Sequence, residues 1–373
     1  MHPLQSVRRL VVKVGSSSLT HRTGKLNLGQ LERLVRELAD LVNQGKEVVL
    51  VTSGAIGAGM GRMGFTKRPK TMPEKQAAAA VGQGLLMHMY EKLFSEYGYT
   101  VGQVLLTRED VADRKRYLNA RNTLITLLQY QVIPIVNEND TVVVEEIRVG
   151  DNDTLAALVA GLVDAELLVL LSDIDGLFTG DPRLDPDAVV IPELEEITPE
   201  IERLAGGAGS TLGTGGMGTK IHAAKMAMSS GIPMVIANGS REGALRRLLA
   251  GEPVGTLFLP RENRLHTKQR WIAFGSAVQG SVRVDGGAAE ALLAAGKSLL
   301  PIGVVKVEGT FEPGNVVSIL SPSGEEIARG ITNYSAEEVR RIQGKKTDEI
   351  AGILGYKDYD EVIHRNNLVV TSD

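Results

Sequence analysis

Two polar clusters interrupt an apolar stretch in the middle of the chain. Residues 133–136 form a short apolar run that breaks off into NEND at 137–140, and GDND at 150–153 precedes a helix whose apolar residues begin at Leu155. Carboxylates and carboxamides at the end of a buried strand and the start of a helix suit a polar ligand, because backbone N–H groups lie nearby. A local alternative is that these residues only cap the helix and form a turn. Two clusters in one strand–helix unit favour a binding site.

The same strand-and-helix pattern extends over the first two thirds of the chain. Residues 10–14 predict a buried strand, the apolar residues between 28 and 42 recur at helical spacing, and residues 47–52 predict a second strand. Further strands are predicted at 101–106, 167–171 and 233–237, and further helices at 74–97, 117–129 and 221–229. Strands joined by helices predict a parallel sheet with right-handed crossovers.

The composition limits the chemistry that the chain can perform. Its 373 residues include no cysteine, which excludes disulfides, thiolate catalysis and cysteine-bound metal, and the six histidines lack a metal-binding spacing, so we expect no zinc site. The net charge of −4 gives no reason to expect binding to nucleic acid or to an anionic membrane. We find no signal-peptide core and no apolar run that would span a bilayer. We therefore expect a cytoplasmic protein with two domains.

A glycine-rich segment at 53–59 follows the second predicted strand, where open α/β sheets bind ligands. Gly59, Gly61 and Gly64 formally satisfy GxGxxG, which raises a dinucleotide-binding alternative. That match is weak, because the fingerprint should follow the strand directly and be followed by an acidic residue about 20 positions later. The basic, proline-containing segment 66–70 comes next instead and predicts a loop.

A second glycine-rich segment, at 206–220, precedes a predicted helix and ends in Lys220. It is not a Walker A loop, because the order here is Gly218-Thr219-Lys220 and the required GK[ST] is missing. Backbone N–H groups at a helix N-terminus nevertheless favour phosphate, and Lys220 adds a positive charge. A flexible linker is the alternative for such a glycine run.

Three charged residues are candidates for phosphoryl transfer at one sheet edge: Lys13, Asp153 and Lys220. Ordinary roles are open to each of them, as a surface lysine, a helix cap and a solvated helix residue. Lysine is rare in an apolar strand, however, which favours a function for Lys13. Phosphoryl transfer needs mainly positioning and positive charge, which two lysines and Mg²⁺ can supply. A carboxylate acceptor, with a pKa of about 4, is ionised at neutral pH and needs no general base.

The last third of the chain has a different character. The strand-and-helix pattern fades between 253 and 270, and we place the domain boundary at 261–268. Short strands are then predicted at 281–285, 303–308 and 315–319, with glycine turns and few helices. From Ser276 onward there are 10 Lys and Arg residues against 14 Asp and Glu residues, so this part is acidic.

Five motifs, in order, resemble the glutamate 5-kinase family. They are KVGSS from Lys13, VTSGAI from Val51, VNEND from Val136, VGDND from Val149, and GTGGM from Gly213 followed by Thr219-Lys220. The match covers almost the whole chain, and the order of five motifs makes it specific. The resemblance implies an amino-acid-kinase fold for residues 1–265, which is a three-layer α/β/α sandwich with a mainly parallel sheet. It implies a small β-rich PUA domain for residues 276–362.

The resemblance also implies an activity and residue roles. The expected reaction is phosphorylation of the γ-carboxylate of L-glutamate by ATP with Mg²⁺, as the first step of proline biosynthesis, with feedback inhibition by proline. The catalytic residues would be Lys13, Asp153 and Lys220, and glutamate would be held by Ser53, Asp140 and Asn152. The nucleotide-binding residues would be Lys13, Ser172, Asp173, Thr214, Gly215, Gly216, Met217, Gly218, Thr219 and Lys220. No residue is assigned as a direct metal ligand. Ser172 and Gly218 depart from the commoner threonine and from serine or alanine, but both remain small.

Other interpretations concern the acceptor and the tail. Asp140 can pair with the α-ammonium of glutamate, whereas it would repel a nucleoside monophosphate, and N-acetylglutamate has no ammonium to offer it. PUA domains elsewhere are associated with RNA, so one alternative is an RNA-binding or regulatory protein. A second alternative is another small-molecule kinase of the amino acid kinase family. We do not expect RNA binding by this tail, because it is acidic, and we interpret Arg340, Arg341, Lys345 and Lys346 as a solvated helix face. The family suggests a homodimer or homotetramer.

Overall fold

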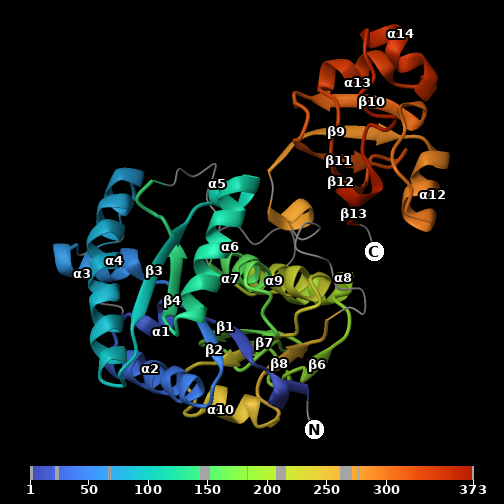
Figure 1. Cartoon of the computed structure of the whole chain (residues 1–373). Coiled ribbons are helices and arrows are strands. Elements are labelled where there is room, and N and C mark those ends of the chain that lie inside the picture. Colours follow the sequence, from blue (N-terminus) through green and yellow to red (C-terminus); the bar gives the residue numbers. More distant parts are fainter. Residues whose placement is uncertain are drawn as a thin grey trace. The chain divides into compact units, whose positions relative to one another are not determined.

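The computed structural model describes residues 3–21, 25–65, 67, 69–142, 152–182, 184–206, 216–260, 271–275 and 277–371. They form two compact units, each considered by itself (Figure 1). The larger unit consists mainly of residues up to 260, and the smaller unit consists mainly of those from 271 onward. The boundary expected at 261–268 lies outside the described residues.

An eight-stranded sheet forms the centre of the larger unit, within the described ranges. Its strands are β1 (Arg9–Val14), β2 (Glu47–Val51), β3 (Val101–Leu106), β4 (Ile133–Glu138), β5 (Leu167–Ser172), β6 (Glu193–Leu194), β7 (Met234–Asn238) and β8 (Thr256–Phe258). Their spatial order is β3-β4-β2-β1-β5-β7-β8-β6. Neighbours from β3 to β7 are parallel, and β8 runs antiparallel to β7. The carboxyl ends of β1 to β5 and of β7 therefore meet at one edge, and the mainly parallel α/β fold is confirmed.

Helices cover both faces of this sheet (Figure 1). They are α1 (Ser16–Leu19), α2 (Leu28–Asn43), α3 (Ala55–Met63), α4 (Met72–Ser95), α5 (Arg108–Ala112), α6 (Arg114–Gln129), α7 (Asn152–Leu162), α8 (Pro199–Leu204), α9 (Met217–Ser229) and α10 (Ala244–Leu249). Leu10, Val12 and Val14 belong to the core shared with α2, α4 and α10. Because side chains alternate along a strand, Val11 and Lys13 point to the other face, where α7 packs on β1 and against α9.

The pairing of α3 with α4 depends on glycine. A Cβ atom on Gly59 would lie 1.7 Å from the Ala78 carbonyl oxygen, and one on Gly82 would lie 1.7 Å from the Ala55 carbonyl oxygen. Any larger residue would force the two helices apart. This contact also explains why the sequence did not predict α3, because a glycine-rich segment has a low intrinsic helix propensity that only tertiary packing overcomes.

The GxGxxG interpretation is wrong. Gly59 and Gly61 lie inside α3, and Gly64 ends that helix in the left-handed region with φ of 76°. None of the three glycines forms the turn between a strand and a helix that cradles a pyrophosphate. The KVGSS motif continues from β1 into the short helix α1, Ser16–Leu19.

The smaller unit contains a five-stranded sheet. Its strands are β9 (Val278–Val284), β10 (Val304–Gly309), β11 (Val316–Leu320), β12 (Glu326–Ile331) and β13 (Leu368–Val370), in the order β10-β9-β11-β12-β13. The described residues also form three helices, α12 (Gly286–Ala295), α13 (Ala336–Ile342) and α14 (Ile350–Leu354), so helices contribute more than expected. Asp285 and Ser335 cap α12 and α13, and residues of these two types favour a helix start.

Two arginines of the supposed solvated helix face have structural partners. Arg340 donates a hydrogen bond to the Gly309 carbonyl over 2.6 Å, and Arg341 donates one to the Ile353 carbonyl. The two side chains therefore link α13 to the end of β10 and to α14. Across the described ranges, the structure contains no helix with the length and apolar character that a membrane crossing requires.

Candidate active site

Three charged side chains meet at the carboxyl edge of the larger sheet, and we call them the charged cluster: Lys13, Asp153 and Lys220. The Lys13 ammonium is paired with Oδ1 of Asp153, and the Lys220 ammonium lies 3.0 Å from Oδ2 of the same carboxylate. All three residues are at least 95% buried. The structure thus brings together the three residues that the sequence suggested for phosphoryl transfer, although 140 and 67 positions separate the pairs.

The fold determines this meeting point. Lys13 is the penultimate residue of β1 and is paired in register with Val51 of β2 and Leu170 of β5. Asp153 is the second residue of α7, and Lys220 lies in the first turn of α9. Because α7 packs against α9, the first turns of both helices come to the end of β1. The N-terminal end of a helix favours negative charge, so this edge suits an anionic ligand.

Asp153 keeps its negative charge at neutral pH. Burial by itself would raise the pKa of Asp153, but the ammonium groups of Lys13 and Lys220 outweigh burial and lower this pKa below its ordinary value. One carboxylate between two ammonium groups leaves one net positive charge. The hydroxyl of Thr219 lies 2.9 Å from Oδ2 of Asp153 and 2.8 Å from the Gly216 carbonyl, so it can donate to either.

The other nucleotide-binding candidates that the structure describes lie at the start of α9 and at the end of β5. Gly216 is the N-cap of α9, and Met217, Gly218 and Thr219 form its first turn. Ser172 is buried at the end of β5, and its hydroxyl donates to the exposed Asp173 carboxylate over 3.2 Å. Thr214 and Gly215 lie outside the described residues.

Beside the charged cluster is an uncharged group of hydrogen-bonding side chains centred on Asn152. Its amide nitrogen lies 2.6 Å from the Thr52 carbonyl, 2.9 Å from the Ser53 hydroxyl and 2.9 Å from Oδ1 of Asn137. The structure therefore brings together Ser53 and Asn152, two of the three residues expected from the sequence to hold glutamate. Asp140, the third candidate, is half-buried in the turn that follows β4.

This uncharged group includes Asn137, which begins the polar cluster at 137–140 but was assigned no role, and two residues of α4 that were not singled out from the sequence. Asn137 is 2% exposed at the end of β4, and its amide nitrogen donates to Gln83 of α4 over 2.9 Å. The Tyr90 hydroxyl, also from α4, lies 2.8 Å from the Thr52 hydroxyl, and burial raises the pKa of this tyrosine so that it stays neutral. The carboxamide of Asn137 at the end of a buried strand is the kind of signal that marked the cluster at 137–140 in the sequence. Nothing local in α4 indicates Gln83. We call Asn152, Asn137 and Gln83 the amide network.

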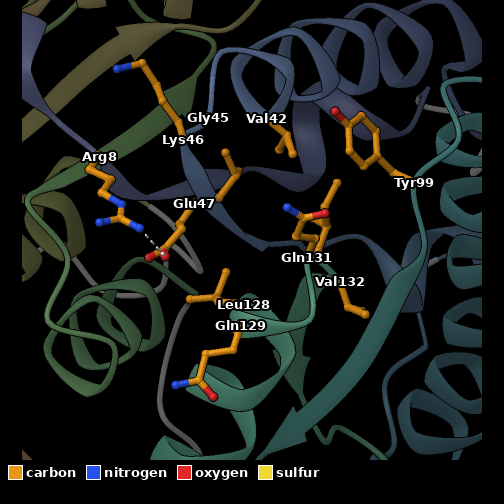
Figure 2. Close-up of a pocket in the computed structure, with 12 residues that line it drawn as sticks. Arg8, Val42, Gly45, Lys46, Glu47, Tyr99, Leu128, Gln129, Gln131 and Val132 are labelled. Atoms are coloured by element: carbon orange, nitrogen blue, oxygen red, sulfur yellow. Dashed lines mark ion pairs between the residues drawn. The ribbon is translucent and has the colours of Figure 1, made fainter.

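A separate cavity of about 420 Å³ lies at the opposite edge of the sheet (Figure 2). It is lined by residues at the beginning of β2 and β4 and at the ends of α2 and α6. The Lys46 ammonium donates to the Val7 carbonyl over 2.6 Å, and Glu47 pairs with Arg9 over 2.6 Å and with Arg8 over 3.7 Å. These charged groups already have partners within the protein, and helix C-terminal ends disfavour an anion. We assign no chemistry to this cavity.

Comparison with known proteins gives the family. Residues 8–238 match the amino acid kinase family, and residues 280–354 match the PUA domain. A glutamate 5-kinase of Moorella thermoacetica is 66% identical over 367 residues, which cover 98% of this chain and 97% of that protein. Glutamate 5-kinases of Carboxydothermus hydrogenoformans and Caldanaerobacter subterraneus are 61% and 59% identical, over 98% and 97% of this chain and the same shares of theirs.

Proposed function

Because the chain belongs to the glutamate 5-kinase family, we propose that it transfers the γ-phosphoryl group of ATP to the γ-carboxylate of L-glutamate. The observation that carries this proposal is the contrast at one sheet edge. A buried charged cluster lies beside an uncharged hydrogen-bonding group, and the adjacent residues Asn152 and Asp153 belong one to each. The first suits phosphate oxygens, and the second suits an amino acid.

In this mechanism Lys13 and Lys220 act on the phosphoryl group in transfer. Charge spreads over the phosphoryl oxygens in the transition state, and ammonium groups that are already in place stabilise it without reorganisation. Asp153 binds both ammonium groups and orients them, and its lowered pKa keeps it ionised in that role. The attacking γ-carboxylate of glutamate is itself ionised at neutral pH, so no side chain has to remove a proton.

Glutamate would be held by Ser53, Asp140 and Asn152. Ser53 and Asn152 are in hydrogen-bond contact at the carboxyl ends of β2 and β4. Asp140 supplies the carboxylate that pairs with the α-ammonium of an unmodified amino acid. The nucleotide would lie against the first turn of α9 and residues 172–173 at the end of β5, with Thr214 to Lys220 as the phosphate loop.

Mg²⁺ would enter with ATP and spread the negative charge of the phosphates. It retains several of its own waters and binds mainly through substrate phosphates, so it needs few protein ligands. Both oxygens of Asp153 are engaged by lysines and Thr219. Within the described residues, no group of three or more His, Asp or Glu side chains could hold a metal. We therefore assign no residue as a direct ligand.

The product would be γ-glutamyl phosphate, the first intermediate of proline biosynthesis. We further propose that proline inhibits the enzyme at or beside the glutamate site, that the protein works as a cytoplasmic homo-oligomer, and that residues 1–265 form the kinase domain. The PUA domain, proposed at 276–362, would serve assembly or regulation, because its acidic balance does not favour RNA.

The decisive experiment is an ATP-consumption assay with Mg²⁺ and four acceptors: L-glutamate, N-acetylglutamate, L-aspartate and UMP. Hydroxylamine would trap any acyl phosphate as its hydroxamate. We expect hydroxamate with L-glutamate alone. Turnover of another acceptor would keep the charged cluster but contradict the proposed glutamate site, and no turnover would contradict the kinase reaction as a whole.

A further inference from the structure

The direction in which Asn152 faces is fixed by a backbone group. The Thr52 carbonyl can only accept a hydrogen bond, so the Asn152 atom 2.6 Å from it must be the amide nitrogen. Three protein acceptors, the Thr52 carbonyl, the Ser53 hydroxyl and Oδ1 of Asn137, compete for the two protons of this nitrogen. Toward a ligand, Asn152 can therefore act only through its oxygen, as an acceptor.

A second backbone group fixes Asn137 in the same way. The Glu138 N–H can only donate, so the Asn137 atom 2.9 Å from it must be Oδ1. The amide nitrogen of Asn137 is then left to point at Gln83, whose Oε1 lies 2.9 Å away. Gln83 is 7% exposed, and its own nitrogen lies 3.5 Å from Oε1 of Gln103 on β3. Asn152 thus donates to Asn137, Asn137 donates to Gln83, and Gln83 donates to Gln103.

The helix α4 is placed so that Gln83 can take part in this chain. The adjacent Gly82 lies so close to α3 that an added Cβ would meet the Ala55 carbonyl at 1.7 Å and the Gly59 nitrogen at 2.5 Å. About two turns further along α4, the Tyr90 hydroxyl forms a hydrogen bond with the hydroxyl of Thr52, the residue whose carbonyl orients Asn152. The same helix therefore supports the glutamate side of the site at two points, through Gln83 and through Tyr90.

We propose that Gln83 is a positioning residue that reinforces the polarity of the glutamate site. By accepting from Asn137, it acts together with the Glu138 N–H to keep Oδ1 of Asn137 directed at Asn152, which in turn keeps the Asn152 oxygen available to accept from the α-ammonium of glutamate. The Ser53 hydroxyl accepts from Asn152, so its own proton is available to a substrate carboxylate. This inference rests on the proposed glutamate kinase reaction and names a residue that does not itself touch the substrate.

A substitution of Gln83→Met tests the proposal, because methionine is similar in size and its thioether sulfur is only a weak acceptor. The buried nitrogen of Asn137 would lose its partner, which favours a rearranged Asn137 and Asn152. We expect KM for L-glutamate to rise about tenfold while KM for ATP stays within about twofold. Gln129→Met, the same substitution at an exposed glutamine of α6 outside the network, is the matched control and should change neither value.

A second readout separates polarity from a general loosening of the site. Glutarate has the two carboxylates of glutamate but no ammonium, so it does not use the Asn152 oxygen. In Gln83→Met its inhibition constant should rise less than KM for L-glutamate. If both constants rise equally, or if KM for ATP rises as much as KM for glutamate, Gln83 has only a structural role.

A variant that keeps the acceptor covers the case in which Gln83→Met does not fold. Gln83→Glu retains an oxygen that can accept from Asn137, and its KM for glutamate should stay within about threefold of the wild-type value. A rise of tenfold or more in this folded variant would overturn the proposal. Wild-type protein that forms no glutamyl hydroxamate would instead contradict the proposed function itself, so the two failures are distinguishable.

Discussion

Asn152 and Asp153 are neighbours in the first turn of α7, yet they belong to two different environments. Asp153 lies between two ammonium groups in the charged cluster, whereas Asn152 is linked to Asn137 and Ser53, which are uncharged. Both surroundings are largely buried at the same sheet edge. The charged side chains gather where the phosphoryl group would be transferred. The amide network, where glutamate would bind, contains no charged side chain.

The difference shows how one helix start can serve two substrates. A buried charge is tolerated when it is paired and hydrogen-bonded, and the charged cluster meets this requirement within itself. An amide network has no net charge, but each of its side chains has a donor end and an acceptor end, so its hydrogen bonds have a defined direction. The two regions should therefore respond differently to substitution, the first in kcat and in stability toward acid, and the second in KM for glutamate.

The largest effect should come from Asp153→Asn. It leaves Lys13 and Lys220 buried without their counter-charge, and we expect a loss of about 3 to 5 kcal/mol in the free energy of unfolding at pH 7. The folded pKa of Asp153 lies below its ordinary value of 3.8, so its contribution is complete above that value and is lost as the pH falls through the folded pKa. Urea unfolding from pH 7 down to pH 3 measures this loss.

The exposed aspartate Asp175 is the control for this titration. Its pKa is lowered chiefly by the hydrogen bond from Arg241, but its side chain is 34% exposed to solvent. Solvent screening should therefore limit the effect of Asp175→Asn to about 1 kcal/mol or less, with the same sign. Equal losses in the two variants would show that burial of the charged cluster does not strengthen it.

Next in size are the two lysines. Lys13→Met and Lys220→Met should each lower kcat by about 10²- to 10³-fold, because one preorganised positive charge is lost from the phosphoryl group in transfer. KM for glutamate should change little, since the amide network stays intact. Steady-state kinetics with the hydroxamate assay gives both values.

Lys225→Met provides the matched control for Lys220→Met. Lys225 lies on the same helix and pairs with Glu202, with 43% of its side chain exposed. Its loss should leave kcat nearly unchanged. A large rise in KM for glutamate in Lys13→Met or Lys220→Met, with kcat preserved, would contradict the assignment of the charged cluster to the phosphoryl group.

The smallest of these effects should come from Asp140→Asn. Loss of one charge-assisted bond to the α-ammonium is worth about 1.5 to 3 kcal/mol, so KM for glutamate should rise about 10- to 100-fold while KM for ATP changes little. The exposed Asp358 of the smaller unit, changed to Asn, serves as the control. Equal increases in KM for the two substrates would remove Asp140 from the glutamate site.

The strands and helices with a regular apolar pattern could be predicted from the sequence, and so could the charged candidates for phosphoryl transfer. Strands β1 and β5 lie in the sheet interior, and their apolar runs, joined to neighbouring strands through helices, indicated both their location and their parallel direction. Lys13 stood out because a lysine interrupts one of them. The helix α3 was missed because its glycines lower local propensity, and α12 and α13 were missed although their caps, Asp285 and Ser335, are visible in the sequence.

The sequence by itself determined the alternation of strands and helices, the charged residues available at the strand ends and the membership of a kinase family. Tertiary structure alone decided which side chains meet, since Asn137 and Gln83 are 54 positions apart and Lys13 and Asp153 are 140 apart. The physical reason is that the periodic pattern reflects which residues face the core, and the amino-acid type at each position shows this directly. A hydrogen bond needs two atoms within about 3 Å, and that depends on close approaches such as the one that Gly82 permits between α3 and α4.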